Sequence, residues 1–181
     1  MMDDYKVCNI ENDSIHMLDM YIEDILKLRR MIWLYTYINE DLGITEDKII
    51  ENFRNFDEEV EAYKKYIYDI KRFSSFFIVI HDKKVIGYSI VKNRYYRKSI
   101  DTLYIDKDYQ GNGLGSLLMN NIIKKLDSKK IYVDVVSYND KAIHFYEKYG
   151  FLYKKKHIPI ILERIDPKIY VPQIRMLRRV S

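Results

Sequence analysis

Three glycines lie within five residues of the stretch DYQGNGLGSLLMNNIIKKL (108–126), although the whole chain contains only six glycines. Glycine adopts positive φ angles and lets a bulky group approach the backbone closely. The stretch follows an apolar run and opens an amphipathic one, which predicts a strand, a glycine turn and a helix. The N–H groups at the start of a helix, together with the helix dipole, favour a bound phosphate. The turn therefore predicts a phosphate-binding site.

Two common phosphate-binding motifs do not fit this turn. A dinucleotide fingerprint requires a third glycine at its sixth position, where this chain has Ser116 or Leu118, depending on which glycine is counted first. A nucleotide P-loop requires a lysine after its last glycine, but Gly115 is followed directly by serine. The pattern that remains is Gln110, two residues, Gly113, one residue and Gly115.

This pattern resembles the motif of the GNAT superfamily of acetyl-CoA-dependent N-acetyltransferases, which follows the fourth strand and opens a helix. Two further stretches are similar to that family: YNDKAIHFYEKYGF at 138–151 and the hairpin strand KKVIGYSIV at 83–91. The resemblance covers residues 76–158. It implies acetyl-CoA as the cosubstrate, and homodimers are frequent in the family.

The resemblance implies that acetyl-CoA is held by a strand end, by the glycine turn and by a later helix. Backbone amides of the turn are expected to bind the pyrophosphate. Backbone groups of the strand are expected to pair with the pantetheine arm, with one N–H polarising the acetyl carbonyl. The expected cofactor-binding residues are Leu103, Tyr104, Ile105, Gln110, Gly111, Asn112, Gly113, Leu114, Gly115, Ser116, Asn139, Ala142 and Tyr146.

Two residues are candidates for moving protons. Tyr146 matches the family tyrosine that protonates the departing thiolate, and a packed core tyrosine is the alternative interpretation. An amine of pKa about 10.4 must lose a proton before it attacks a carbonyl carbon. Asp101 occupies a strand position where many family members carry a glutamate base. Because aspartate is shorter than glutamate, an ordinary surface carboxylate stays open as the alternative.

These features predict an enzyme that moves an acetyl group from acetyl-CoA to a primary amine by direct attack. The acidic stretch at 39–61 would attract a cationic acceptor such as a small amine or polyamine, and solvated helix faces are the other interpretation. A peptide or protein amine is the second candidate acceptor, with the link at 159–172 as one wall of a groove. A coenzyme A-binding module without turnover is the third candidate. Trp33, Tyr35 and Tyr37 are expected either to pack in the core or to line the acceptor site.

The composition is that of a folded domain outside the membrane, since 48% of the 181 residues are apolar and 32% are charged. Cys8 is the only cysteine, which excludes an intrachain disulfide and a cysteine metal cluster. The four histidines lack metal-binding spacing, so no metal is expected. Neither a secretion signal nor an apolar run of the roughly 20 residues that span a bilayer is present, which predicts a cytoplasmic protein. The basic C-terminal tail lacks interleaved aromatic residues and does not predict nucleic-acid binding.

The elements that must position these residues follow from periodicity and from turn residues. Helices are expected at 12–38, 45–53, 57–73, 114–127 and 139–149, with Asp13 or Ser14, Thr45 and Asn139 as N-caps and Gly150 as a C-cap. Strands are expected at 5–10, 75–80, 85–91, 99–106, 129–137, 151–158 and 173–180. In the fourth strand, Asp101 and Tyr104 are expected on opposite faces. Three prolines, Pro159, Pro167 and Pro172, are expected to keep the last link irregular.

This order predicts an α/β (α+β) fold with a mixed, mostly antiparallel sheet of six to seven strands and helices on both faces. That arrangement is the GNAT-like acyl-CoA N-acyltransferase fold. A single domain is expected over 1–181. Its parts would be a strand and acceptor-side helices at 1–75, an acetyl-CoA-binding core at 76–158, and a C-terminal link and last strand at 159–181.

Overall fold

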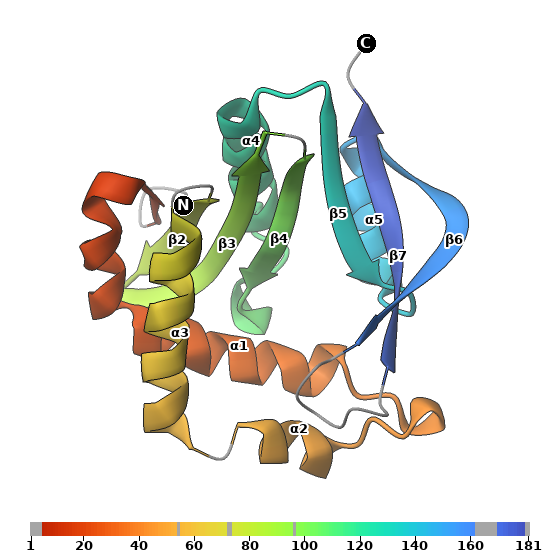
Figure 1. The fold of residues 1–181 in the computed structure, drawn as a ribbon, viewed down its shortest axis with the longest axis horizontal. Helices are drawn as coiled ribbons and strands as arrows, with labels where there is room; N and C mark the ends of the chain where they lie inside the picture. Colours follow the sequence, from red (N-terminus) through yellow and green to blue (C-terminus); the bar gives the residue numbers. More distant parts are fainter. Residues whose placement is uncertain (1–4, 54, 72–73, 96, 162–169, 180–181) are drawn as a thin grey trace. The chain divides into compact units, whose positions relative to one another are not determined.

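The computed structural model describes residues 5–53, 55–71, 74–95, 97–161 and 170–179. The chain divides into two compact units, each built from two separate segments. Figure 1 labels the helices and strands. The first unit comprises Met1–Ile32 and Asn55–Asp127, and the second comprises Trp33–Arg54 and Ser128–Ser181. The predicted single domain over 1–181 stays a prediction.

The first unit contains four antiparallel strands in the order β1-β2-β3-β4. They are β1 (Lys6–Ile10), β2 (Ser74–His81), β3 (Lys84–Arg94) and β4 (Arg97–Ile105). The turn between β2 and β3 places Asp82 and Lys83 at φ angles of 47° and 64°. Two successive positive φ angles are typical of the tight turns whose twist matches that of the flanking strands. The predicted hairpin is confirmed.

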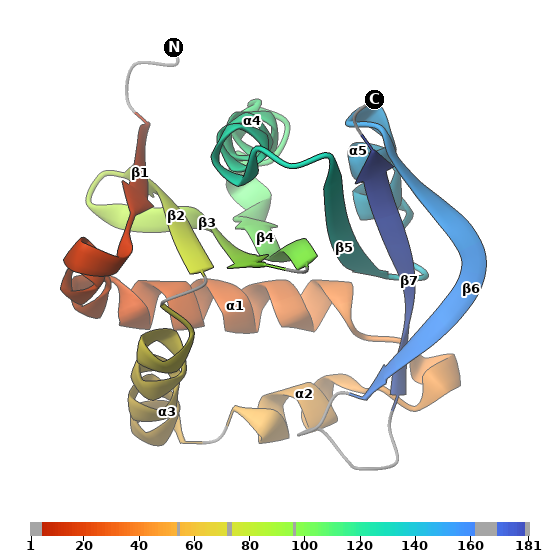
Figure 2. The same ribbon diagram turned by 45° about the horizontal axis from the view of Figure 1, so that its top comes forward.

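Helices cover both faces of this four-stranded sheet, as Figure 2 shows. One face packs against η1 (Asn12–Met20), α1 (Ile22–Thr36) and α3 (Phe56–Ile70), and the buried residues include Leu26, Ile67, Ile78 and Ile90. The helix α4 (Leu114–Leu126) packs against β3 and β4 from the other side. This arrangement confirms the predicted helix that follows the glycine turn.

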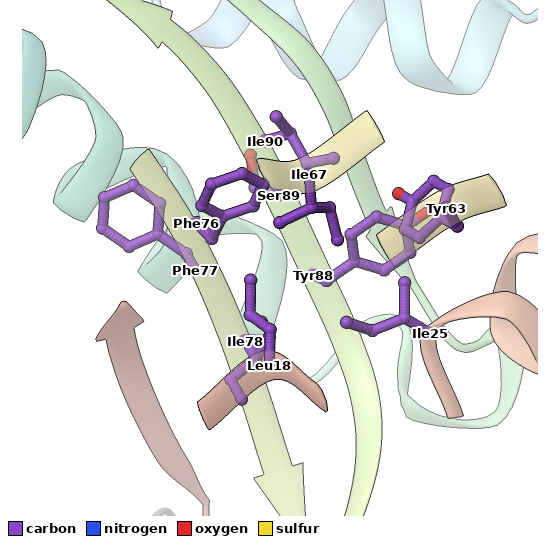
Figure 3. Close-up of a pocket in the computed structure, with 10 residues that line it drawn as sticks. All are labelled: Leu18, Ile25, Tyr63, Ile67, Phe76, Phe77, Ile78, Tyr88, Ser89 and Ile90. Atoms are coloured by element: carbon purple, nitrogen blue, oxygen red, sulfur yellow. The ribbon is translucent and has the colours of Figure 1, made fainter. Parts of the chain in front are cut away.

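A small cavity lies in the core between the sheet and α3 (Figure 3). Its volume is about 10 Å³, which is room for about one water molecule. Its lining surface is apolar, although Tyr63, Tyr88 and Ser89 are among the residues that line it. The cavity is too small for a substrate, so it is a packing feature of the core.

The first helical segment differs from the prediction at its start. Residues 12–20 form a 3₁₀ helix, and the α-helix begins only at Ile22. The N-cap is Glu11 rather than Asp13 or Ser14, because Ser14 itself has φ −112° and ψ 16° and its hydroxyl donates to the Glu11 carbonyl. Serine side chains compete in this way with the backbone bonds of a regular helix.

The strand β4 contains a bulge that its alternation pattern did not predict. Two neighbouring residues of β3 pair with β4 residues that are two apart, which leaves Asp101 as the extra residue. Asp101 accepts a hydrogen bond from Tyr66 of α3, and Tyr104 packs with the core cluster on the same side. The prediction that Asp101 and Tyr104 face opposite sides is therefore wrong, since the bulge resets the alternation.

The second unit contains three antiparallel strands in the order β5-β7-β6. Its elements are η2 (Glu40–Leu42), α2 (Glu46–Asn52), β5 (Lys130–Val136), α5 (Asp140–Lys148), β6 (Phe151–Ile161) and β7 (Tyr170–Arg179). Thr45 is the N-cap of α2, as predicted, although its side chain makes no capping hydrogen bond. The helix α5 packs against β6. A small core joins the segment around α2 to the sheet through Ile44, Ile49, Val136 and Val171.

Two of the three prolines of the last link lie inside strands. Pro159 of β6 and Pro172 of β7 face each other in register, so the prediction that they keep the link irregular is wrong. Pro159 is on the edge strand, where a missing N–H costs no bond on the outer side. Pro172 comes just before Gln173, the first β7 residue along the chain that pairs with β5. Pro167 and the rest of 162–169 lie outside the described residues.

Candidate active site

The glycine turn is tied to the end of β4 by side-chain hydrogen bonds. After Ile105 the chain enters the short helix η4 (Lys107–Tyr109), which is capped by Asp106 through a bond from the Asp108 N–H of 3.1 Å. Gln110 Nε2 then donates to the Ile105 carbonyl at 2.9 Å. The glutamine of the motif therefore fixes where the turn begins relative to the strand.

Two glycines of the turn have backbone angles that favour glycine. Gly111 has φ 85°, and a Cβ built on it would meet nothing within 4 Å, so the backbone angle alone accounts for this glycine. Gly113 has φ 80° and is the N-cap of α4. The first four N–H groups of a helix lack partners within the helix. Here the cap has no side chain, and the first turn of α4 carries no acidic residue, which suits an anionic ligand.

The strand end before the turn is held by a close backbone approach. Gly87 of β3 pairs with Ile105, and a Cβ at Gly87 would lie 2.6 Å from Ile105 Cδ1 and 3.0 Å from the Tyr104 carbonyl oxygen. A residue with a Cβ at this position would require the Ile105 side chain and the Tyr104 carbonyl to shift. The Tyr104 ring meets the Tyr88 ring edge-on, with centroids 5.5 Å apart. Leu103 is partly buried and Ile105 is buried.

The Asp101 carboxylate has two partners from other elements. Lys92 Nζ of β3 lies 2.6 Å from Oδ1, and the Tyr66 hydroxyl of α3 donates to Oδ2 at 3.1 Å. Burial and the adjacent Asp101 charge raise the pKa of the Tyr66 hydroxyl above its ordinary value. Sequence reasoning missed Tyr66 and Lys92 because their contact with Asp101 depends on the bulge and on the packing of α3.

The other predicted site residues lie on α5 of the second unit. Asn139 Oδ1 accepts a hydrogen bond from the Ala142 N–H at 3.0 Å, which confirms Asn139 as the N-cap. The C-cap of α5 is Tyr149, and the predicted Gly150 is the next residue, where a φ of 77° ends the helix as glycine commonly does. The Tyr146 ring is buried, with an exposed fraction of 6%, and packs edge-on against the rings of Phe145 and Phe151.

The structure thus collects the predicted site residues into two groups. The first unit holds Asp101, the strand end at 103–105 and the turn at 110–116, all within one continuous stretch. The second unit holds Asn139, Ala142 and Tyr146. Their predicted contacts with acetyl-CoA stay predictions.

The acidic stretch at 39–61 contains carboxylates that pair with cations of the protein and carboxylates that are exposed. Glu59 in the first unit receives hydrogen bonds from Arg29 at 2.7 Å and Arg30 at 2.9 Å, so its charge is used in joining α1 to α3. Five acidic side chains of this stretch that belong to the second unit are exposed: Glu40, Asp41, Glu46, Asp47 and Glu51.

Two of the three candidate aromatic residues are packed. The Trp33 ring lies 4.9 Å from the Tyr37 ring and 5.2 Å from the Phe53 ring, measured between centroids. Tyr37 is buried, which favours core packing for these two residues. Tyr35 has an exposed fraction of 42% and is the one of the three that a solvent molecule reaches readily.

Among the described residues, no group of three or more histidine, cysteine, aspartate or glutamate side chains is placed to hold a metal ion. In the same part of the chain, no helix combines the length and the apolar character needed to cross a membrane.

Known proteins are similar to this chain in sequence and in fold. The model of the acetyltransferase (GNAT) family matches residues 42–151, which is more than half of the chain. A spermidine N(1)-acetyltransferase of Vibrio cholerae is 30% identical over 121 residues, covering 64% of this chain and 69% of that protein. A spermine/spermidine N(1)-acetyltransferase of Bacillus subtilis is 35% identical over 63 residues, covering 33% of this chain and 41% of that protein.

A solved structure of the PaiA N-acetyltransferase from Thermoplasma acidophilum, in complex with coenzyme A, superposes with a TM-score of 0.66. The two sequences are 17% identical, and the match covers 97% of this chain and 99% of that one. This likeness confirms the predicted α/β class and the acyltransferase fold. Together with the family match, it shows that the chain belongs to the GNAT family of acetyl-CoA-dependent N-acetyltransferases.

Proposed function

We propose that this enzyme acetylates a primary amine of a small cationic acceptor, with polyamines as the favoured class. The observation that carries the proposal is the 30% identity with a spermidine N(1)-acetyltransferase over 69% of that protein. The exposed acidic side chains of the second unit support it, because they raise the local concentration of a cation near the surface.

The glycine turn is the proposed site for the pyrophosphate of acetyl-CoA. The N–H groups of 113–116 at the start of α4 would donate to its oxygens, with Gln110, Gly111 and Asn112 shaping the approach. Backbone groups of 103–105 would pair with the pantetheine arm. Asn139 would add a contact through its amide while its oxygen caps α5, since an asparagine side chain has both donor and acceptor atoms. Ala142 is the proposed neighbour on the same helix.

Proton transfer is assigned to Asp101 and Tyr146. Acetyl-CoA supplies a thioester, and the amine displaces its sulfur as the new carbon–nitrogen bond forms. Asp101 would accept the proton that the ammonium must lose, directly or through water. Tyr146 would donate its hydroxyl proton to the departing sulfur, and the second proton lost by the acylated nitrogen would restore the tyrosine, directly or through water. The products are then an N-acetylated amine and coenzyme A with a free thiol.

An acceptor screen with the purified full chain tests the proposal. Acetyl-CoA is offered together with spermidine, spermine, 1,4-diaminobutane, an aminoglycoside, free amino acids and N-terminal peptides, and products are identified by mass. Acetylation of polyamines with the highest kcat/KM supports the proposal. A clear preference for peptides would replace it with a protein acceptor. Binding of acetyl-CoA without transfer to any amine would favour the module without turnover.

A cytoplasmic location and a homodimer both stay predictions. A molar mass measured by light scattering decides the second.

A further inference from the structure

The carboxylate of Asp101 lies in an unusual electrostatic setting. It is the only acidic side chain between Lys84 and Ile105, a hairpin that otherwise carries Lys92, Arg94, Arg97 and Lys98. The Lys92 ammonium lies 2.6 Å from the carboxylate and 6.0 Å from the centre of the Tyr66 ring. A carboxylate beside an aromatic face is a combination that binds ammonium groups in proteins.

We propose that Asp101 and Tyr66 form the binding site for an ammonium group of the acceptor, and that Lys92 occupies this site in the free protein. Lys92 is then a specificity-determining residue, because every cationic acceptor must compete with its ammonium. This inference rests on the proposed function, since it assigns the place where that acceptor binds.

The charge balance around the site supports competition. Lys92 neutralises Asp101, while the nearby cation Arg29 is already engaged by Glu59 at 2.7 Å. Burial raises the pKa of Tyr63 to about 12, so this neighbour of Tyr66 is uncharged at neutral pH. Because Lys92 neutralises Asp101, a second ammonium beside the intact ion pair would meet no net negative charge to bind it. The incoming cation must therefore displace Lys92.

Lys92 and Asp101 are exposed enough for an acceptor ammonium to replace the Lys92 ammonium. Lys92 and Asp101 retain 23% and 31% of their side-chain exposure, so solvent and small solutes reach the pair. A lysine side chain is long and flexible, and it can move its ammonium into water without disturbing β3. The Tyr66 hydroxyl continues to hold the other carboxylate oxygen during the exchange.

The test compares three variants in the full chain: Lys92→Met, Lys92→Arg and Lys125→Met. The last is a matched control, because Lys125 forms a 2.5 Å ion pair with Glu11 in the same unit, away from Asp101. KM is measured for 1,4-diaminobutane and for 1-aminobutane. We expect Lys92→Met to lower KM for both amines by about two- to fivefold, the range set by partly exposed ion pairs. Lys92→Arg and Lys125→Met should keep the KM of the unmodified enzyme.

A double-mutant cycle with Asp101→Asn distinguishes two roles of Lys92. In the first, its ammonium competes with the acceptor for Asp101, and in the second it only stabilises the fold. If Lys92 acts by occupying Asp101, then Lys92→Met has no effect on amine affinity once Asp101 is neutral. Affinity is measured by calorimetry with 1,4-diaminobutane in the presence of coenzyme A, so the cycle does not depend on turnover. Melting temperatures show that each variant is folded.

The outcomes are distinct. An unchanged or raised KM in folded Lys92→Met overturns the inference. Lys92 would then only stabilise the bulge in β4 through its ion pair with Asp101. Absence of transfer to any amine in the unmodified enzyme instead contradicts the proposed function. In that case tighter calorimetric binding of the diamine to Lys92→Met still supports the ammonium site, and equal binding overturns it.

Discussion

Tyr146 combines a packed ring with the role proposed for its hydroxyl. The ring packs edge-on against the rings of Phe145 and Phe151, and these contacts restrict the direction of the side chain. A proton donor works best when its position is held before the reaction begins, because no entropy is then lost in orienting it. Burial by aromatic neighbours is therefore compatible with a catalytic hydroxyl.

Replacing Tyr146 with phenylalanine tests this role at the level of one atom. The ring contacts survive, so the melting temperature and the Kd for acetyl-CoA should change little. We expect kcat to fall by about 10²-fold, the lower range of general acid catalysis. Steady-state kinetics and calorimetry measure the two quantities. Tyr149→Phe, which keeps a ring that also packs against Phe145, is the control and should retain full turnover. Equal kcat in both variants would remove the assigned role.

At the scale of elements, the helix starts at α4 and α5 carry most of the proposed cofactor site. The start of α4 depends on a glycine with positive φ, and the start of α5 depends on an asparagine cap. Both devices leave backbone or amide groups directed out of the helix end, which is where an anionic or polar ligand binds favourably. Each helix start offers its own experiment.

Gly113→Trp blocks the proposed pyrophosphate site. The unmodified enzyme should gain about 5 to 10 °C in Tm at an acetyl-CoA concentration of about 100 times Kd. We expect this gain to vanish in Gly113→Trp, because the indole covers the backbone N–H groups. Differential scanning calorimetry with and without ligand measures it. Gly43→Trp controls for backbone strain, since Gly43 also has a positive φ of 69°. A full gain in folded Gly113→Trp would contradict the placement of the pyrophosphate.

Asn139→Ala tests whether Asn139 only caps α5 or also binds acetyl-CoA. Loss of an N-cap side chain costs about 1 kcal/mol of unfolding free energy. Asn55→Ala is the matched variant, because Asn55 caps α3 through an equivalent bond from the Glu58 N–H at 3.1 Å. Urea denaturation should show similar losses for both. Only Asn139→Ala should weaken acetyl-CoA binding, and an unchanged Kd would leave Asn139 with its capping role alone.

For the whole molecule, one buried and two half-buried tyrosines make the free energy of unfolding depend on alkaline pH. Burial raises the pKa of Tyr63 and of Tyr138 to about 12, one in each compact unit, and it raises the pKa of Tyr88 well above its ordinary value. These hydroxyls stay protonated in the folded state while the unfolded state ionises at its ordinary pKa near 10. The stability they contribute is therefore complete below about pH 10 and is lost as the pH rises toward 12.

The free energy of unfolding should fall between pH 10 and 12, and Tyr63→Phe should reduce that fall by up to about 2 kcal/mol. Urea denaturation at pH 8, 10 and 11.5 measures the slope. Tyr95→Phe is the control, because Tyr95 is fully exposed and its substitution should leave the slope unchanged. The same slope in Tyr63→Phe and in the unmodified protein would show that Tyr63 is not a source of the linkage.

Much of the local structure could be read directly from short-range patterns. Asn139 was correctly assigned as the N-cap of α5, and the predicted Gly150 is the residue after its C-cap, because capping depends on a few neighbouring residues. The glycine turn, its strand and its helix followed from spacing and periodicity. The same short patterns identified the family, since its motif is a local backbone arrangement with fixed glycine positions.

Long-range packing decided the features that sequence reasoning missed. The bulge at Asp101 depends on how β3 and β4 pair, and it overrides the alternation within β4. The partners of that carboxylate, Tyr66 and Lys92, come from residues 35 and 9 positions away. The pairing of Pro159 with Pro172 likewise depends on β6 lying at the edge beside β7. Sequence alone therefore determined the family and the turn that is proposed to bind its cosubstrate. Only tertiary structure decided what surrounds Asp101, because those contacts join segments that share no local pattern.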